Sequence, residues 1–384
     1  MRKVLLLALG TFALGLDAFI VAGLIPDISA QTGVTEADVG QMVTVFTLSY
    51  AVSGPLLSSL LKADAKTLLL ASMLVFTVGN VASATADSFA ELLVSRVVAG
   101  VGAGLYSPTA AASAAHLAPP EKRGRALSVI LAGMSVGTVI GVPVGLMLAA
   151  QLGWRSAFWW VSAIGVLATA AIAIFVPRLH IPAPPGVAAR LATLTDRRVT
   201  PIILVTLLFN IASLGLYTYI APILQATAGI TRPTMFLWVW GVGGIVGAVT
   251  IGALVDRAAS ATRVMPFVLS LFILAAAAIT PAGSAPVLLA VALGCWGAAG
   301  FASPPPQQHL LLERAPDRGA VAVAVNGSAI YLGSTLGSAL AGVALHAGVG
   351  LSHLPPLAAG IAGLALVAYV TLVIPQTAGG RRTR

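Results

Sequence analysis

The chain has 384 residues, of which 58% are hydrophobic and 9% are charged, with a net charge of +9 and a mean hydropathy of +0.98. A soluble domain carries roughly 25% charged residues, so this composition excludes an ordinary soluble enzyme and a disordered protein and indicates a polytopic membrane protein. The single cysteine, Cys295, excludes a disulfide framework and a multi-cysteine metal site, and the scattered basic residues exclude a nucleic-acid-binding face.

Twelve mostly apolar runs are long enough for membrane helices, which need about 20 residues each. They lie at 4–25, 37–61, 67–86, 89–115, 126–150, 156–176, 200–225, 234–254, 264–282, 285–311, 319–346 and 356–375. The first run carries an acid in its middle and lacks a clear cleavage motif, so it is predicted to be a span and not a cleaved signal peptide. The predicted fold class is an all-α membrane protein with twelve transmembrane helices.

Lysine and arginine predict the orientation of these spans, because basic residues are retained on the cytoplasmic side. With the N-terminus inside, 18 of the 21 basic residues fall in cytoplasmic segments. Arg155 and Arg232 fall in outside loops, and Arg96 lies within the fourth span. The pattern therefore predicts a multi-pass protein with both termini in the cytoplasm.

The longest predicted cytoplasmic connection, 177–199, separates two sets of six spans. It contains four prolines and several arginines, which is typical of a linker. A weak repeat supports the division, because Ser128, Gly133 and Gly137 recur 200 residues later as Ser328, Gly333 and Gly337. We predict an N-terminal six-helix half at 1–176, a linker at 177–199, and a C-terminal six-helix half at 200–384 with a short cytoplasmic tail. Two such halves would place a substrate path between them.

Glycines mark expected helix contacts. Gly133, Gly137, Gly141 and Gly145 are four residues apart and share one face of the fifth span, where a neighbouring helix can approach closely. Pro143 interrupts the same helix and is expected to bend it. The fourth span carries a similar series, of which Gly100 and Gly104 are candidate gating residues.

Four segments resemble motifs of the major facilitator superfamily, in its twelve-span drug:proton antiporter group. The fourth-span motif is matched by Arg96-x3-Gly100-x-Gly102-x-Gly104, and the fifth-span antiporter motif by Gly133-x3-Gly137-x3-Gly141-Val-Pro143-x-Gly145. The turn into the sixth span is matched by Gly153-Trp154-Arg155 with Phe158, and the second cytoplasmic gating loop by Gly252-x3-Asp256-Arg257 with Arg263. The first gating loop departs from the family pattern: Lys62 replaces the usual aspartate, and Asp64 follows two residues later.

The resemblance implies the major facilitator fold, with two pseudo-symmetric halves that work by alternating access. It implies a proton-coupled antiporter of the bacterial cell (inner) membrane that exports small amphipathic organic compounds, as in drug efflux and antibiotic resistance. The alternative is efflux of a sugar, nucleoside or other metabolite by the same fold. No P-loop, catalytic triad or metal-ligand spacing is found, so we expect no enzyme and no cofactor. The expected partners are the small-molecule substrate, protons and the lipid bilayer, and we expect a monomer that binds no nucleic acid.

Two charges lie well inside predicted spans, Asp17 in the first and Arg96 in the fourth. Asp17 is about eight residues from the outer end of its helix and Arg96 about seven, so at ~1.5 Å per residue both lie at a similar depth. Placing an ionisable side chain at this depth in the bilayer costs roughly 2.5–3.5 kcal/mol of insertion free energy. Each group is therefore expected to have a partner or a function. One interpretation is a static ion pair that locks two helices. We favour a proton-coupling site, because antiport needs a titratable group and no other span carries a mid-membrane carboxylate.

Polar and aromatic residues inside the other spans are candidates for the wall of a substrate cavity. An apolar and aromatic wall with a few amides suits amphipathic organic molecules better than sugars or ions. The candidate substrate-binding residues are Tyr50, Asn80, Asn210, Tyr217, Tyr219, Trp240, Asn326 and Tyr331. In the tenth span, the run Pro304-Pro305-Pro306-Gln307-Gln308 is expected to break the helix and to form a gate.

Overall fold

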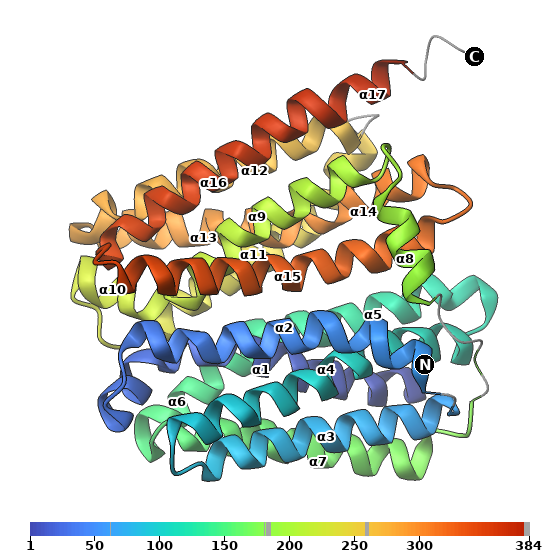
Figure 1. Cartoon of the computed structure of the whole chain (residues 1–384), viewed down its shortest axis with the longest axis horizontal. Coiled ribbons are helices and arrows are strands. Elements are labelled where there is room, and N and C mark those ends of the chain that lie inside the picture. The colour runs from blue at the N-terminus through green and yellow to red at the C-terminus, as the bar shows by residue number, and fades with distance from the viewer. Residues whose placement is uncertain (62, 180, 182–185, 258–260, 380–384) are drawn as a thin grey trace. The chain divides into compact units, whose positions relative to one another are not determined.

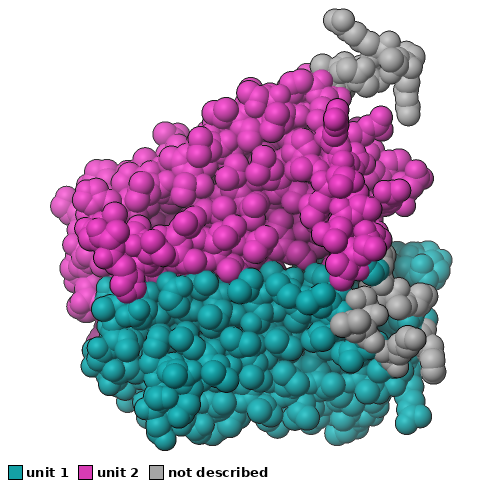
Figure 2. All heavy atoms as spheres, in the orientation of Figure 1, with its two compact units in different colours: residues 1–186 teal, residues 187–384 magenta. Residues whose placement is uncertain are grey.

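The computed structural model describes residues 1–61, 63–179, 181, 186–257 and 261–379, apart from the side chains of 58–60, 253, 256, 257, 261 and 377–379. All regular secondary structure in these described residues is helical (Figure 1), which confirms the all-α prediction. By its internal contacts the chain divides into two compact units, Met1–Gly186 and Val187–Arg384, coloured teal and magenta in Figure 2. The boundary between the units falls within the segment 177–199 that is predicted as a linker.

Unit 1 begins with four long helices, and its fifth span is divided into three pieces. Its elements are α1 (Arg2–Thr32), α2 (Glu36–Leu60), α3 (Ala65–Thr85), α4 (Phe89–Leu117), the 3-10 turn η1 (Pro120–Lys122), α5 (Arg123–Val136), the π-helical η2 (Gly137–Gly141), α6 (Val142–Leu152) and α7 (Arg155–Phe175).

Unit 2 starts with a short helix inside the predicted linker and then continues with its own set of spans. Its elements are α8 (Val187–Leu194), α9 (Thr200–Thr218), α10 (Ile220–Ala228), α11 (Thr234–Arg257), α12 (Ala261–Ile279), η3 (Pro281–Ser284), α13 (Pro286–Ala302), α14 (Pro304–Arg314), α15 (Gly319–His346), η4 (Leu351–His353), α16 (Leu354–Ala368), the π-helical η5 (Tyr369–Val373) and α17 (Ile374–Gly379).

Within the described residues, eleven helical stretches are long and apolar enough to cross a membrane. The remaining predicted span, 37–61, forms α2, which has 25 residues but is not among those eleven. Large apolar side chains cover the outside of the spans; Leu167 and Ile174 on α7, for example, are 61% and 71% exposed. Helices that are apolar on every face need an apolar surrounding, so the chain is a multi-pass membrane protein.

Polar side chains at the helix starts explain where several spans begin. The Thr35 hydroxyl accepts a hydrogen bond from the Asp38 amide at 3.2 Å, and the Asp38 carboxylate accepts one from the Thr35 amide at 3.3 Å, which is a capping box. Asp64 caps α3 by accepting from the Thr67 amide and hydroxyl. The hydrogen bond from the Thr67 hydroxyl lowers the pKa of Asp64. Asp64 is therefore engaged as a helix cap, and Lys62 lies outside the described residues.

Prolines account for two interruptions within spans, because proline has no N–H to donate to the helix. The expected disturbance at Pro143 takes the form of a π-helical turn at Gly137–Gly141, which ends two residues before the proline. The expected break at Pro304 is also confirmed, since α13 ends at Ala302 and α14 begins at Pro304 after the single residue Ser303.

Close glycine contacts join the first span of each unit, α1 or α9, to the span that carries the repeated glycines. In unit 1, a Cβ on Gly133 would lie 2.5 Å from the Ala8 carbonyl oxygen. A Cβ on Gly137 would clash with the Phe12 carbonyl oxygen. In unit 2, a Cβ on Gly333 would lie 2.9 Å from the Leu207 carbonyl oxygen, and one on Gly337 would clash with that of Ile211. The same pair of contacts therefore recurs in unit 2. The glycines are offset by 200 residues and their partners on the first span by 199, so the sequence repeat is also a packing repeat.

Candidate functional site

A buried ion pair joins α1 and α4 inside unit 1. Arg96 Nη1 lies 2.8 Å from Asp17 Oδ1, and Arg96 Nη2 lies 3.0 Å from Asp17 Oδ2, so the pair is bidentate. The Asp17 side chain is 0% exposed and that of Arg96 is 1% exposed. The two charges that were expected at a similar depth are thus in direct contact, and each neutralises the other in an environment where a lone charge is very costly.

Asn80 on α3 connects to both members of this pair. Its Nδ2 donates to the backbone oxygen of Phe76 at 3.0 Å and to Asp17 Oδ2 at 3.4 Å, while its Oδ1 accepts from Arg96 Nη1 at 3.2 Å. The Phe76 carbonyl can only accept, so it determines which end of the amide faces Asp17. Asn80 therefore acts as a bridge that ties α3 to the α1–α4 ion pair.

Two aromatic rings lie against the Arg96 guanidinium. Its central carbon is 4.4 Å from the centroid of the Phe46 ring on α2 and 5.5 Å from that of Phe158 on α7. Cation–π contact of this kind stabilises a cation that water cannot reach. The Nε atom of Arg96 has no hydrogen-bond partner among the described residues. The sequence indicated Phe158 only through a motif, and nothing in the apolar run around Phe46 singled that residue out.

The glycine face of the fifth span packs against α1 over its whole length. Besides the contacts of Gly133 and Gly137, a Cβ on Gly141 would lie 3.2 Å from Leu16 Cβ, and one on Gly145 would meet the Ile20 side chain. The predicted close helix contact is confirmed, and Asp17 follows Leu16 directly on the helix that these glycines hold.

The fourth-span glycines make the equivalent contact with α2. A Cβ on Gly100 would lie 2.9 Å from Ser49 Cβ, and one on Gly104 would lie 2.9 Å from the Tyr50 Cα. The predicted gating residues Asp256 and Arg257 are the last two residues of α11, and their side chains lie outside the described part of the chain. A gating role for any of these residues remains a prediction.

An aromatic cluster lies in the core of unit 2. The ring centroids of Tyr217 and Trp240 are 4.5 Å apart, and the Trp296 ring is 6.2 Å from each of them. Phe301 packs against Trp240 with a centroid distance of 5.5 Å. The Trp296 indole N–H donates to the Ser213 hydroxyl at 2.9 Å. Trp296 was not predicted as a site residue, whereas Trp240 was, because nothing in their two apolar runs separates a tryptophan that binds a ligand from one that packs in the core.

A second buried group in unit 2 is built from amides around one hydroxyl. The Thr206 Oγ1 on α9 lies within hydrogen-bond distance of Gln307 Oε1 and at 2.6 Å from Asn326 Oδ1, and Asn210 Nδ2 donates to the Thr206 carbonyl at 2.7 Å. A hydroxyl has one proton, so it donates to one of the two amide oxygens at a time. Asn326 Nδ2 is buried without a partner among the described residues. The cluster therefore has spare hydrogen-bonding capacity.

The eight predicted substrate-binding residues fall into several groups. Asn80 belongs to the ion pair, Asn210 and Asn326 belong to the amide group, and Tyr217 and Trp240 belong to the aromatic cluster. Tyr219 is buried where α9 ends, and its hydroxyl donates to the Ser338 carbonyl at 3.3 Å. The remaining two are Tyr50, buried on α2, and Tyr331, half-buried on α15. Of the amide group, Thr206 was missed, and Gln307 was expected in a gate.

Comparison with known proteins gives a consistent result over almost the whole chain. The model of the Major Facilitator Superfamily matches residues 7–338. The inner membrane transport protein YdhP of Escherichia coli strain K12 is 32% identical over 366 residues, 94% of each chain. A chloramphenicol resistance protein of Streptomyces lividans is 34% identical over 263 residues, 66% of each chain. The crystal structure of the nucleoside transporter NupG is similar in fold, with a TM-score of 0.76 at 12% identity over 97% of this chain and 100% of that one.

Proposed function

Since this chain belongs to the major facilitator superfamily and is a membrane transporter, not an enzyme, we propose that it exports small amphipathic organic compounds in exchange for a proton. The observation that carries the proposal is the buried site of Asp17, Arg96 and Asn80. Drug export has support from the relative of Streptomyces lividans that is named a chloramphenicol resistance protein. The basic residues of the cytoplasmic segments support an inner-membrane location with both termini inside.

Asp17 is the group that would carry the proton. A carboxylate can take up a proton and become neutral, whereas the Arg96 guanidinium stays charged at any physiological pH. Protonation replaces two charge-assisted hydrogen bonds by weaker ones and leaves the guanidinium without a counter-charge. The protonated state therefore weakens the link between α1, α3 and α4.

The proton site would act from one unit only. By the offset of 199 that relates Ala8 to Leu207 and Phe12 to Ile211, the residue corresponding to Asp17 in unit 2 is Leu216. Leu216 is buried and cannot titrate. A single carboxylate in unit 1 supports exchange of about one proton per cycle.

The substrate would meet the apolar and aromatic groups of unit 2. Tyr217, Trp240 and Trp296 offer ring faces, and Asn326 offers a buried amide whose Nδ2 has no partner among the described residues. A wall of rings with a few fixed polar groups suits a molecule with an apolar body and one or two polar groups.

The alternative candidate is export of a sugar, nucleoside or other polar metabolite. The observation in its favour is the amide group of Thr206, Gln307 and Asn326, because amides and hydroxyls are the groups that recognise substrate hydroxyls. The two candidates differ in the substrate and share the proton site.

The test has two parts. A growth-inhibition panel in a pump-deficient strain identifies the exported compound, and protection against no compound with altered uptake of sugars would favour the metabolite alternative. With a transported compound in hand, Asp17→Asn should abolish proton-driven export in proteoliposomes and leave ligand binding measurable, because the amide has nearly the same size and does not titrate. Asp87→Asn makes the same chemical change at an exposed position and should transport normally. If Asp17→Asn released as many protons as the wild type when ligand is added, the proton role of Asp17 would be refuted.

A further inference from the structure

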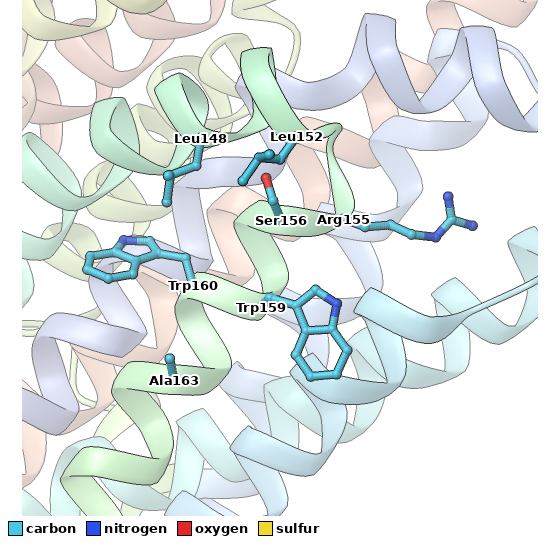
Figure 3. A pocket seen from close by; sticks show the side chains of 7 residues that line it. All are labelled: Leu148, Leu152, Arg155, Ser156, Trp159, Trp160 and Ala163. Carbon is cyan, nitrogen blue, oxygen red and sulfur yellow. The ribbon is translucent and has the colours of Figure 1, made fainter.

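A pocket with a volume of about 550 Å³ lies between α6 and α7 of unit 1 and shares no lining residue with the site of Asp17, Arg96 and Asn80. Figure 3 shows Leu148 and Leu152 of α6 facing Ser156 and Trp160 of α7, while Arg155 reaches outward from the turn between the helices. The pocket is large enough for part of a small organic molecule or for a lipid segment.

The lining changes from polar to apolar along the helix. Arg155 and Ser156 are the first two residues of α7, and Ala163 lies about 12 Å further along it at ~1.5 Å per residue. Trp159 and Trp160 lie between them, and tryptophan is enriched where a span meets the membrane surface. The polar end of the pocket therefore lies at the level of the lipid headgroups and the apolar end at the level of the acyl chains.

The polar groups of the pocket are donors. The indole Nε1 of Trp160 is buried without a hydrogen-bond partner among the described residues, and indole N–H can only donate. Arg155 Nη2 donates to the Ala86 carbonyl at 2.8 Å, and the central carbon of its guanidinium lies 4.3 Å from the centroid of the Trp154 ring. The pocket lining contains no acidic side chain that could balance the Arg155 charge. The Ser156 hydroxyl donates to the Gly153 carbonyl at 2.7 Å. A complementary occupant presents acceptor oxygens and a negative charge at this end.

The surroundings of the pocket are apolar and open. Leu152 is 72% exposed, Trp159 49% and Val166 57%, so this face of the two helices meets the hydrocarbon of the bilayer. We propose that the pocket binds one anionic phospholipid from the leaflet on the side of the α6–α7 turn. Its phosphate and ester oxygens accept from Arg155 and Trp160, and one acyl chain lies along Leu148 and Ala163.

A lipid fits these features better than the other possible occupants. If a second copy of this chain packed here through the same surface, each Trp160 would face donors and apolar side chains. Its indole N–H would then find no acceptor. A phospholipid supplies the charge, the acceptors and the apolar chain in the order in which the pocket presents their partners.

The experiment uses the full chain in nanodiscs that contain equal amounts of phosphatidylglycerol and phosphatidylcholine. After transfer to detergent, native mass spectrometry counts the lipids that remain bound. The test variant is Ala163→Phe, which fills the exposed apolar end of the pocket and removes no donor. Val166→Phe, on the exposed face of α7 outside the pocket lining, is the matched control. Trp160→Phe removes the indole donor and keeps an aromatic ring.

The wild type and Val166→Phe should retain one phosphatidylglycerol in preference to phosphatidylcholine. Ala163→Phe should lower its retention about tenfold or more, and Trp160→Phe should lower the preference for the anionic lipid. Equal retention of phosphatidylglycerol in Ala163→Phe and Val166→Phe would overturn the proposal, as would equal binding of both lipids by the wild type. Loss of a dimer in Ala163→Phe without a change in lipid would assign the pocket to a second copy of the chain. If Ala163→Phe does not fold, an unchanged lipid preference in Trp160→Phe would also refute the lipid site.

Discussion

The ion pair of Asp17 and Arg96 makes a quantitative prediction about stability. Asp17→Asn leaves the Arg96 guanidinium buried with no counter-charge, and a guanidinium cannot be neutralised by losing a proton. Removing one partner of a buried, hydrogen-bonded pair costs about 3–5 kcal/mol. For a unit of the size of Met1–Gly186, about 2–4 °C of melting temperature per kcal/mol gives a lowering of about 6–20 °C.

Arg96→Met should cost less than Asp17→Asn at acidic pH. Methionine fills the space between Phe46 and Phe158, and the remaining carboxylic acid can be neutralised by a proton. The double variant Asp17→Asn/Arg96→Met has no buried charge, so it should be more stable than Asp17→Asn alone. Its destabilisation should fall below the sum of the two single losses by about 0.5–3 kcal/mol, the usual coupling energy of residues in contact.

The assay is thermal unfolding of the purified protein in detergent, followed by circular dichroism at fixed pH and salt. The control is Asp87→Asn, which changes an exposed acid and should shift stability by no more than about 0.5 kcal/mol. A melting temperature of Asp17→Asn within 2 °C of the wild type (roughly 1 kcal/mol or less) would show that the ion pair does not stabilise the protein as expected. The same conclusion would follow if the double variant were no more stable than Asp17→Asn.

Three further predictions follow from the charges and the packing. A reporter fused within 177–199 should read as cytoplasmic and one fused near Arg232 as external, and the opposite pattern would overturn the orientation. Gly137→Ala places a methyl group against the α1 backbone and should cost about 1–3 kcal/mol in thermal unfolding, whereas Gly124→Ala meets open space and should cost nothing measurable; equal effects would contradict the packing argument. If Asp17 alone couples transport, export of a neutral compound should respond to the membrane potential, which supplies roughly 2.3 kcal/mol per charge at 100 mV, and a dication should be a poor substrate. Proteoliposomes with independently set potential and pH gradient test this, and efficient export of a dication would contradict it.

The sequence alone determined the class of the protein and the approximate extent of its helices. Apolar runs such as 156–176 and 319–346 correspond closely to α7 and α15, because burial in a bilayer requires each helix to satisfy its own backbone hydrogen bonds within one continuous segment. The effects of proline at 143 and 304 could also be anticipated, because the missing N–H acts within one turn of the residue itself. Four-residue glycine spacing likewise predicted a close contact.

The identity of the contacting helix required the tertiary structure. The glycine series of the fifth span could have faced any neighbour, and the structure pairs it with α1. These helices are apolar on nearly every face, so hydropathy does not reveal which face of a helix turns toward which partner. Packing of small residues between helices decides that rotation.

The same reason explains which site residues sequence reasoning could not assign. Asn80 and Asn326 look alike in sequence, as single amides within apolar runs. In the structure Asn80 joins the charges of Asp17 and Arg96, while Asn326 lies beside Thr206, and its Nδ2 bonds to nothing in the described part of the chain. Local sequence sets the depth of a side chain in the membrane, through the fixed rise of a helix. Contacts between residues that are 63, 79 or 120 positions apart depend on how whole helices pack, and only the folded chain brings these groups together.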